Sequence, residues 1–140
     1  MANINILGVG IDIVEINRFS MDSAFGSSRI FCENEQKYLQ TNNKHVESMA
    51  GLFAAKEAVV KALGTGFRGF FPSQIEISHN SLGKPNVILH GNAKLLSEKI
   101  LKNANKSNNP RRRYRLNIDV SISHNKTTAI AIAVVSYSYK

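Results

Sequence analysis

Residues 46–63 read VESMAGLFAAKEAVVKAL and are the segment of this 140-residue chain with the clearest helical character. The segment is rich in alanine, which favours a helix, and Gly64 follows it, where a glycine commonly ends one. Four small residues permit close packing on a sheet: Ala54, Ala55, Ala58 and Ala62. The sequence therefore predicts a long helix covering a sheet.

The flanking segments supply that sheet. Residues 4–16, INILGVGIDIVEI, are apolar on both parities and rich in β-branched residues, which predicts a strand buried on both faces. Residues 116–123 and 127–135 alternate and predict a hairpin. The other predicted elements are helices at 33–40 and 93–102, the second capped by Asn92, and paired strands at 74–78 and 87–89. This order predicts an α+β fold: one domain, 1–140, with an antiparallel sheet packed on a long helix.

Composition narrows the class of protein. The formal net charge is +8, which favours polyanionic partners such as nucleic acid, an acidic protein or a phosphorylated cofactor. Apolar runs are short and fall well below the roughly 20 residues of a membrane span. We see no signal peptide, and the single cysteine, Cys32, cannot form an internal disulfide. We expect a cytoplasmic protein that does not cross a membrane.

Asp12 is the first candidate functional residue, because it interrupts an apolar run from Val9 to Val14. A buried carboxylate must be paired, hydrogen-bonded or metal-bound, since burying it alone costs several kcal/mol. It shares strand parity with Gly8 and Gly10, so another element can approach this face closely. A structural interpretation, in which Asp12 caps a turn or pairs with a lysine, stays open.

Glu57 and Lys61 lie four residues apart on the long helix, on the same row as Phe53. An exposed ion pair is the ordinary interpretation of this spacing, but the aromatic residue in the row argues against a fully solvated face. Asp12 and Glu57 together could hold Mg²⁺ with help from substrate phosphates. Lys61 could then neutralise a leaving phosphate. The spacing alone does not decide between these interpretations.

Two further patterns carry polar residues. Ser121 and Ser123 alternate with apolar residues, and His124 ends the strand, where it could act near phosphate or be structural. Arginines surround Tyr114 at positions 111–115 and fit a solvated loop, an acidic partner, nucleic acid or ligand phosphates. No pattern of a helix-turn-helix, a zinc finger or an RNA-recognition module accompanies them, and no nucleophile–base pair or zinc-ligand spacing is evident.

Four segments, in this order, resemble the holo-[acyl-carrier-protein] synthases of the 4′-phosphopantetheinyl transferase superfamily, over nearly the whole chain. They are GIDIVE at 10–15, FAAKEA at 53–58 running into KALGTG at 61–66, GKP at 83–85 and SISH at 121–124. The resemblance implies the 4′-phosphopantetheinyl transferase fold. It also implies Mg²⁺-dependent transfer of 4′-phosphopantetheine from coenzyme A to a serine of apo acyl carrier protein, with release of adenosine 3′,5′-bisphosphate. The holo carrier then supports fatty acid biosynthesis.

The resemblance also implies residue roles and assembly. Asp12 and Glu57 would bind magnesium, and Glu57, Lys61 and His124 would be catalytic. Contacts with coenzyme A are expected at Asp12, Lys56, Lys61, Gly64, Thr65, Gly66, Lys84, Pro85 and His124, and carrier docking at Arg18 and Phe53. Family members of this size are homotrimers with active sites between subunits. The nucleophile would belong to the carrier, which explains why this chain offers none.

Two features depart from the family pattern. Leu52 stands where members often carry an arginine, so one basic contact is missing or supplied elsewhere. Residues 103–115 are longer and more basic than usual. They leave one alternative function, a nucleic-acid-binding module that uses the cluster Arg111–Arg115, which we rank well below the transferase.

Overall fold

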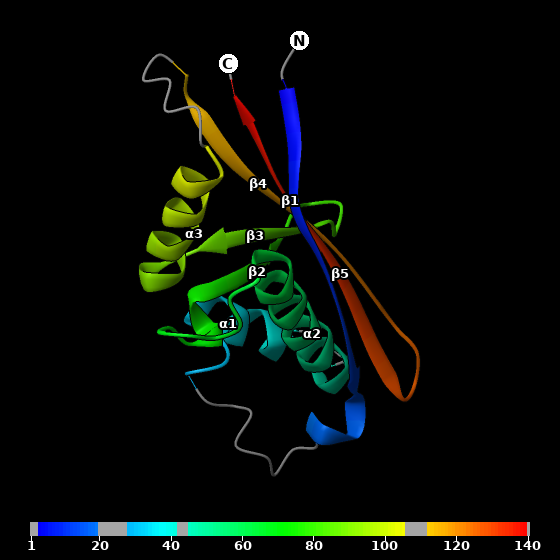
Figure 1. Ribbon diagram of the computed structural model, residues 1–140. Helices are drawn as coiled ribbons and strands as arrows, with labels where there is room; N and C mark the ends of the chain where they lie inside the picture. The colour runs from blue at the N-terminus through cyan, green and yellow to red at the C-terminus, as the bar shows by residue number, and fades with distance from the viewer. Residues whose placement is uncertain (1–2, 20–27, 42–44, 106–111, 140) are drawn as a thin grey trace.

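The computed structural model describes residues 3–19, 28–41, 45–105 and 112–139. Within these ranges the strands form two antiparallel sheets, one in the order β1-β5-β4 and one that pairs β2 with β3. The strands are β1 (Asn3–Glu15), β2 (Ile75–His79), β3 (Pro85–Leu89), β4 (Tyr114–His124) and β5 (Thr128–Tyr139). The helices are α1 (Glu33–Thr41), α2 (His45–Leu63) and α3 (Gly91–Ala104), with short 3₁₀ turns η1 (Ile16–Phe19) and η3 (Pro72–Gln74). Figure 1 shows α2 lying along the larger sheet.

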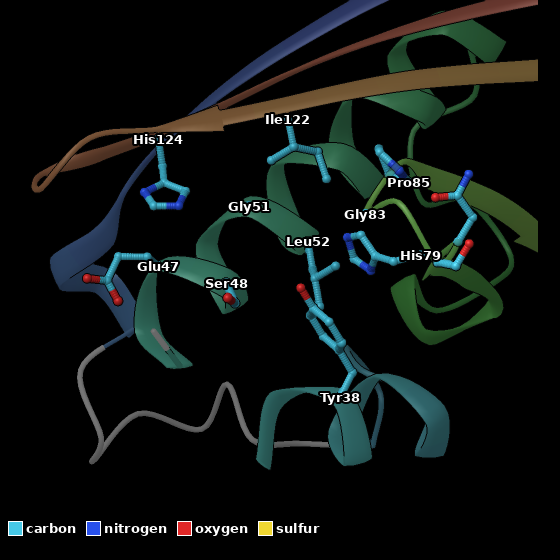
Figure 2. A pocket seen from close by; sticks show the side chains of 12 residues that line it. Tyr38, Glu47, Ser48, Gly51, Leu52, His79, Gly83, Pro85, Ile122 and His124 are labelled. Carbon is cyan, nitrogen blue, oxygen red and sulfur yellow. The ribbon is translucent and has the colours of Figure 1, made fainter. Parts of the chain in front are cut away.

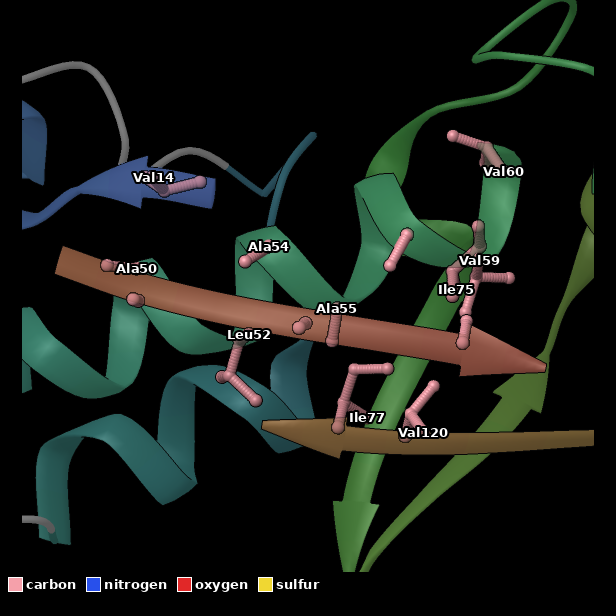
Figure 3. Packing of buried hydrophobic residues seen from close by; sticks show 14 of the residues in the cluster. Val14, Ala50, Leu52, Ala54, Ala55, Val59, Val60, Ile75, Ile77 and Val120 are labelled. Carbon is pink, nitrogen blue, oxygen red and sulfur yellow. The ribbon is translucent and has the colours of Figure 1, made fainter. Parts of the chain in front are cut away.

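Small residues bring α2 against the sheet. On β5, Ala129, Ala131 and Ala133 are almost completely buried. On β1, a Cβ atom added at Gly8 or Gly10 would collide with backbone carbonyls of α2. The predicted close approach on the Asp12 face of β1 is therefore confirmed. Figure 3 shows the apolar residues packed at this contact.

The C-terminus of α2 is fixed by a glycine cap. Gly64 adopts a φ of +74°, and its N–H donates to the carbonyl of Lys61 at 3.1 Å. The N–H of Thr65 donates to the carbonyl of Val60 at 3.1 Å. This pair of bonds is a Schellman motif, so the predicted stop at Gly64 is confirmed, and it sets where Lys61 and the following loop lie.

The outer face of the larger sheet is apolar and exposed in this chain. Side chains at alternate positions of β1 point away from α2 and are 57–70% exposed: Ile4, Ile6, Val9, Ile11 and Ile13. Ile130 and Ile132 of β5 continue the surface. The prediction that residues 4–16 are buried on both faces is wrong for the single chain, because α2 covers only one face. We call these seven residues the outer apolar face.

The predicted fold class is confirmed, since an antiparallel sheet packs on one long helix. The predicted cap of the last helix is wrong. α3 begins at Gly91, after His90, and the Asn92 side chain instead donates to the carbonyl of Gly69 at 3.1 Å. No helix in the described ranges has the length and apolar character needed to cross a membrane.

Candidate active site

Asp12 lies on the inner face of β1 and pairs with Lys61 of α2. Lys61 Nζ donates to Asp12 Oδ1 at 2.8 Å and to the carbonyl oxygen of Ile11 at 3.0 Å. The Asp12 side chain is 15% exposed, whereas that of Lys61 is 51% exposed. The buried carboxylate therefore has a cationic partner at the surface, and Lys61 reaches β1 from the last turn of α2.

Glu57 lies one helical turn before Lys61, beside Asp12. Burial raises the pKa of the Glu57 carboxyl, and the negative charge of Asp12 raises it further, while Lys61 and Arg18 offset part of the rise. Two carboxylates thus share one partly buried place, with the cations Lys61 and Arg18 nearby. Such a pair is a natural site for a cation.

The residues fit a magnesium site of the open kind. Mg²⁺ is usually held by one or two carboxylates, with waters and substrate phosphates as the other ligands. Asp12 and Glu57 could supply two such oxygen ligands. No group of three or more His, Cys, Asp or Glu side chains suited to a metal occurs in the part of the chain that the structure describes. The described residues therefore contain no metal cage built from protein ligands alone.

Arg18 and Phe53 adjoin this place. The ring of Phe53 lies 5.6 Å from that of Phe19, measured between centroids, and this contact packs η1 against α2. Arg18 is exposed in η1 and close enough to influence Glu57. We call Asp12, Glu57, Lys61 and Arg18 the β1-side cluster.

The loop after α2 leads away from the cluster through exposed backbone. Gly64 and Gly66 both have positive φ, and a Cβ atom at either would meet no neighbour within 4 Å. The Thr65 hydroxyl donates to the carbonyl of Gly66 at 2.9 Å. The glycines are needed for backbone conformation, and the loop offers open space to a ligand.

A cavity of about 480 Å³ opens on the other side of α2. Figure 2 shows Ile122 and His124 of β4 on one side of it, Ser48 and Leu52 of α2 behind it, and Tyr38 of α1. Its volume is in the range of small-molecule sites. We call it the β4-side cavity. His124 lines it, so this predicted site residue sits in the cavity and not in the β1-side cluster.

The hairpin of β2 and β3 supplies the far wall of the β4-side cavity. Pro85 lines it. Lys84 lines an adjoining hollow of about 460 Å³, and its Nζ lies 4.0 Å from Asp119 Oδ1, with both side chains largely exposed. Pro85 therefore lines the cavity itself, whereas Lys84 is an exposed cation in the hollow next to it.

Tyr38 and His79 also line the cavity, although no sequence motif marks either residue. Their rings stack, with centroids 4.6 Å apart and an interplanar angle of 16°. Burial lowers the pKa of the His79 imidazole, and the Glu35 carboxylate offsets part of this. Both residues lie in short elements without a chemical motif, so only the folded chain reveals that they share a wall.

The position of Lys56 contradicts the prediction that this residue contacts coenzyme A. Its side chain is completely buried, and Nζ donates to Glu35 Oε2 at 2.8 Å and to the carbonyls of Pro72 and Ile75. Three acceptors use all three ammonium hydrogens, so no donor is left for a ligand. Because adjacent residues of a helix point about 100° apart, Lys56 lies on a different face of α2 from Glu57.

The arginine-rich segment lies far along β4 from His124. Arg111 falls outside the described residues. Arg112 stacks on the ring of Tyr139, with its guanidinium carbon 4.4 Å from the centroid, and Arg113 and Arg115 are exposed. His124 follows Tyr114 by ten positions along β4, at about 3.3 Å each, so this cluster is remote from the β4-side cavity.

The β1-side cluster and the β4-side cavity are separated by α2. Asp12 and Ile122 both pair with Ala131 of β5, from opposite sides, which places β1 and β4 about 10 Å apart. Above them, Ser48 precedes Glu57 by nine residues, or about 2.5 helical turns, and so faces the opposite side of α2. Within one chain the predicted site residues thus form two groups.

Comparison with known proteins gives a consistent result. The family model of the 4′-phosphopantetheinyl transferase superfamily matches residues 8–126. The holo-[acyl-carrier-protein] synthase of Clostridium perfringens (strain SM101 / Type A) is 48% identical over 103 residues, which cover 71% of this chain and 77% of that protein.

Solved structures of holo-[acyl-carrier-protein] synthases are also similar to this chain. Holo-ACP-synthase from Plasmodium yoelii superposes with a TM-score of 0.75 at 26% identity, covering 96% of this chain and 97% of that one. The holo-(acyl-carrier-protein) synthase from Bacillus anthracis str. Ames, solved in complex with CoA (3′,5′-ADP), gives a TM-score of 0.66 at 32% identity, covering 94% of this chain and 96% of that one.

Proposed function

The chain belongs to the holo-[acyl-carrier-protein] synthases, within the 4′-phosphopantetheinyl transferase superfamily, and we infer that it transfers 4′-phosphopantetheine from coenzyme A to apo acyl carrier protein. The acceptor is a serine hydroxyl of the carrier, and the second product is adenosine 3′,5′-bisphosphate. The holo carrier made in this way supports fatty acid biosynthesis. The match to residues 8–126 supports a single transferase domain over 1–140.

The observation that carries this function at the level of chemistry is the β1-side cluster. Asp12 and Glu57 would hold Mg²⁺, which when bound would neutralise charge on the diphosphate of coenzyme A. Lys61 already donates to Asp12 Oδ1 at 2.8 Å, and its exposed ammonium would stabilise the negative charge that develops on the leaving bisphosphate.

Glu57 is the proposed base, directly or through a water that it orients. The serine oxygen of the carrier forms a bond to the β-phosphorus, the bond from that phosphorus to the bisphosphate oxygen breaks, and the serine proton passes to Glu57. Burial, and then the charge of Asp12, raise the pKa of the Glu57 carboxyl in the metal-free chain.

The β4-side cavity would receive the nucleotide part of coenzyme A. His124 and Pro85 line it, and Lys84 at the rim would reach a phosphate. Leu52 forms part of the back wall without a charge, so the phosphate contacts on this side rest on His124 and Lys84. The glycine loop at 64–66 would contact coenzyme A on the side of the ligand that faces away from this cavity.

We propose that the working enzyme is a homotrimer with its sites between subunits. Coenzyme A must meet the cluster and the cavity together, yet α2 separates them within one chain. The outer apolar face adjoins the β1-side cluster, and exposed surfaces of this kind mark protein contacts. A second copy that covers this face could bring its own β4-side cavity to the cluster.

Arg18 and Phe53 are proposed to dock the carrier. Arg18 is exposed beside Glu57, and the net charge of +8 favours an acidic partner. The comparisons support the transferase and give no support to the nucleic-acid-binding alternative. We therefore assign the remote arginine cluster no role in transfer.

Product release tests the function. Purified protein with coenzyme A, Mg²⁺ and apo carrier should release one adenosine 3′,5′-bisphosphate per carrier, as followed by chromatography. Chelation of the metal should stop the release, and so should a carrier without its acceptor serine. Release that continues without carrier would instead indicate hydrolysis and overturn the assignment.

A further inference from the structure

A completely buried ion pair joins Glu35 of α1 to Lys56 of α2. The side chains are 1% and 0% exposed, and Lys56 Nζ lies 2.8 Å from Glu35 Oε2. Every polar group of the pair is satisfied. The carboxylate also accepts from the N–H of Cys32 and of Ile77, each at 2.9 Å. A pair in this condition is held in one geometry, because moving either partner would leave a buried charge unpaired.

The pair ties together four parts of the fold. Glu35 is the third residue of α1, and its bond to the Cys32 N–H closes the start of that helix. Its other oxygen holds β2 at Ile77. Lys56 holds the passage from η3 into β2 through the carbonyls of Pro72 and Ile75. The middle of α2 is thus fixed against α1, η3 and β2 at a single point.

That point controls the direction of Glu57. Successive residues of a helix point about 100° apart, so fixing Lys56 toward α1 and β2 fixes Glu57 toward the β1-side cluster. A small rotation of α2 about its axis would move Glu57 relative to Asp12, which is anchored on β1. The geometry of the two proposed metal ligands therefore depends on where Lys56 is held.

The same point controls the wall of the β4-side cavity. Tyr38 follows Glu35 by three residues, so both lie on nearly the same face of α1. His79 follows Ile77 by two residues on β2, on the same side of the strand. Tyr38 thus lies about one helical turn from Glu35 itself. His79 lies two residues from Ile77, whose N–H donates to the Glu35 carboxylate, and its ring stacks on that of Tyr38.

We propose that Glu35 and Lys56 are positioning residues, which set the rotation of α2 so that Glu57 faces Asp12 and which hold Tyr38 and His79 at the cavity. This inference rests on the proposed function, because it gives Glu57 and the cavity their roles. It goes further by assigning to one remote pair the alignment of both groups of site residues. A pair that only stabilises the fold would leave metal affinity unchanged in any variant that folds.

The variants separate these two roles. Lys56→Met and Glu35→Met each remove one partner, and the double variant Glu35→Met with Lys56→Met replaces the pair by apolar side chains, which commonly restores stability. Glu35→Asp keeps the charge but shortens the side chain by one methylene. The matched control is Glu33→Met with Lys37→Met, an exposed pair on the same helix with Nζ and Oε1 2.7 Å apart.

Two readouts are needed. Mn²⁺ binding, followed by the loss of the free-ion signal in electron paramagnetic resonance, reports on Asp12 and Glu57 without turnover. Steady-state transfer reports kcat and the KM for coenzyme A. In the folded double variant and in Glu35→Asp, we expect Mn²⁺ affinity to fall about tenfold or more and kcat/KM to fall about 10²-fold. The control pair should behave as the wild type.

Two results would contradict the positioning proposal. If either the double variant or Glu35→Asp is folded, by its thermal midpoint and circular dichroism, and keeps wild-type Mn²⁺ affinity and kinetics, the pair is only structural. If both fail to fold, the pair is required for folding itself and the positioning proposal is overturned. Absence of transfer in the wild type would contradict the proposed function instead, so the two failures are distinguishable.

Discussion

At the scale of single residues, the Asp12 carboxylate is the centre of the account. It is 15% exposed and held by the ammonium of Lys61. Burial raises the pKa of Glu57, and the charge of Asp12 raises it further. The two carboxylates of the cluster would repel the phosphates of the proposed substrate. A divalent cation resolves this conflict, because it is attracted by both carboxylates and by the diphosphate.

We predict that Asp12→Asn and Glu57→Gln each reduce metal-dependent transfer by about 10²-fold or more, since each removes one charged metal ligand. Both variants should remain folded, because the amides are isosteric. Mass spectrometry of the carrier measures transfer, and thermal unfolding measures folding. Glu98→Gln, an exposed carboxylate on α3, is the control. Full activity in either test variant would exclude that residue as a ligand.

Residue roles could be predicted from sequence only where a motif carried them. Asp12, Glu57 and Lys61 were selected correctly as neighbours, but Lys61 pairs with Asp12 across 49 positions of sequence, and not with Glu57 on its own helix. Lys56 was assigned to the ligand because it stands beside Glu57. A helix sends adjacent residues to different faces, and Glu35, its actual partner, gave no sign of burial in a polar segment.

At the scale of elements, contact between α2 and β1 positions the β1-side cluster. The backbone carbonyl of Ala58 occupies the place that a Cβ atom at position 10 would take. Asp12 is two residues further along the same face of β1. The separation of helix and strand therefore sets the distance between Asp12 and the row that contains Glu57 and Lys61.

We predict that Gly10→Ala lowers the free energy of unfolding by about 1–3 kcal/mol or more, because the added methyl forces backbone away from backbone. Transfer should fall as well, since Asp12 moves relative to Glu57. Chemical denaturation and the transfer assay measure the two effects. Ser121→Ala on β4 is exposed and should change stability by no more than about 0.5 kcal/mol. Equal stability of Gly10→Ala and the wild type would show that the packing is looser than described.

Elements were largely predictable because their periodicity is local. The long helix, its glycine stop and both hairpins follow from alternation, alanine content and turn residues. The exposure of one face of residues 4–16 was not predictable, because an apolar strand face looks the same in sequence whether its own chain covers it or leaves it exposed. The cavity wall formed by Tyr38 and His79 depends on tertiary packing and leaves no local pattern.

At the scale of the whole molecule, α2 divides the predicted site residues of one chain into two groups, and we propose that assembly unites them. The outer apolar face is continuous across the sheet, since Ile11 pairs with Ile132 and Ile13 with Ile130. Burying such a surface supplies roughly 25 cal/mol for each Å² of apolar area. In the proposed trimer, burial of this face would favour assembly.

We predict that Ile11→Glu, which places a charge in this face, converts a trimer of about three times 15.5 kDa into a folded monomer without transfer activity. Light scattering after size-exclusion chromatography measures the mass. Leu95→Glu is the control, because Leu95 is 63% exposed on α3, away from the sheet. If Ile11→Glu stays trimeric and active, the subunits meet through another surface.

Mixed subunits test whether sites are shared. Glu57→Gln and His124→Ala chains should each be inactive alone, but co-assembled trimers should regain part of the activity. In them, some sites combine an intact β1-side cluster from one chain with an intact β4-side cavity from the other. Carrier modification by the mixture measures the gain. No recovery, with mixed trimers confirmed by tagged pull-down, would place each site within one chain.

The mass of the carrier protein is the most direct measure of phosphopantetheine transfer. Incubated with this protein, coenzyme A and Mg²⁺, apo acyl carrier protein should gain the mass of one phosphopantetheine group on its acceptor serine, and removal of Mg²⁺ should prevent the gain. A competent apo carrier whose mass stays unchanged under these conditions would contradict the assignment.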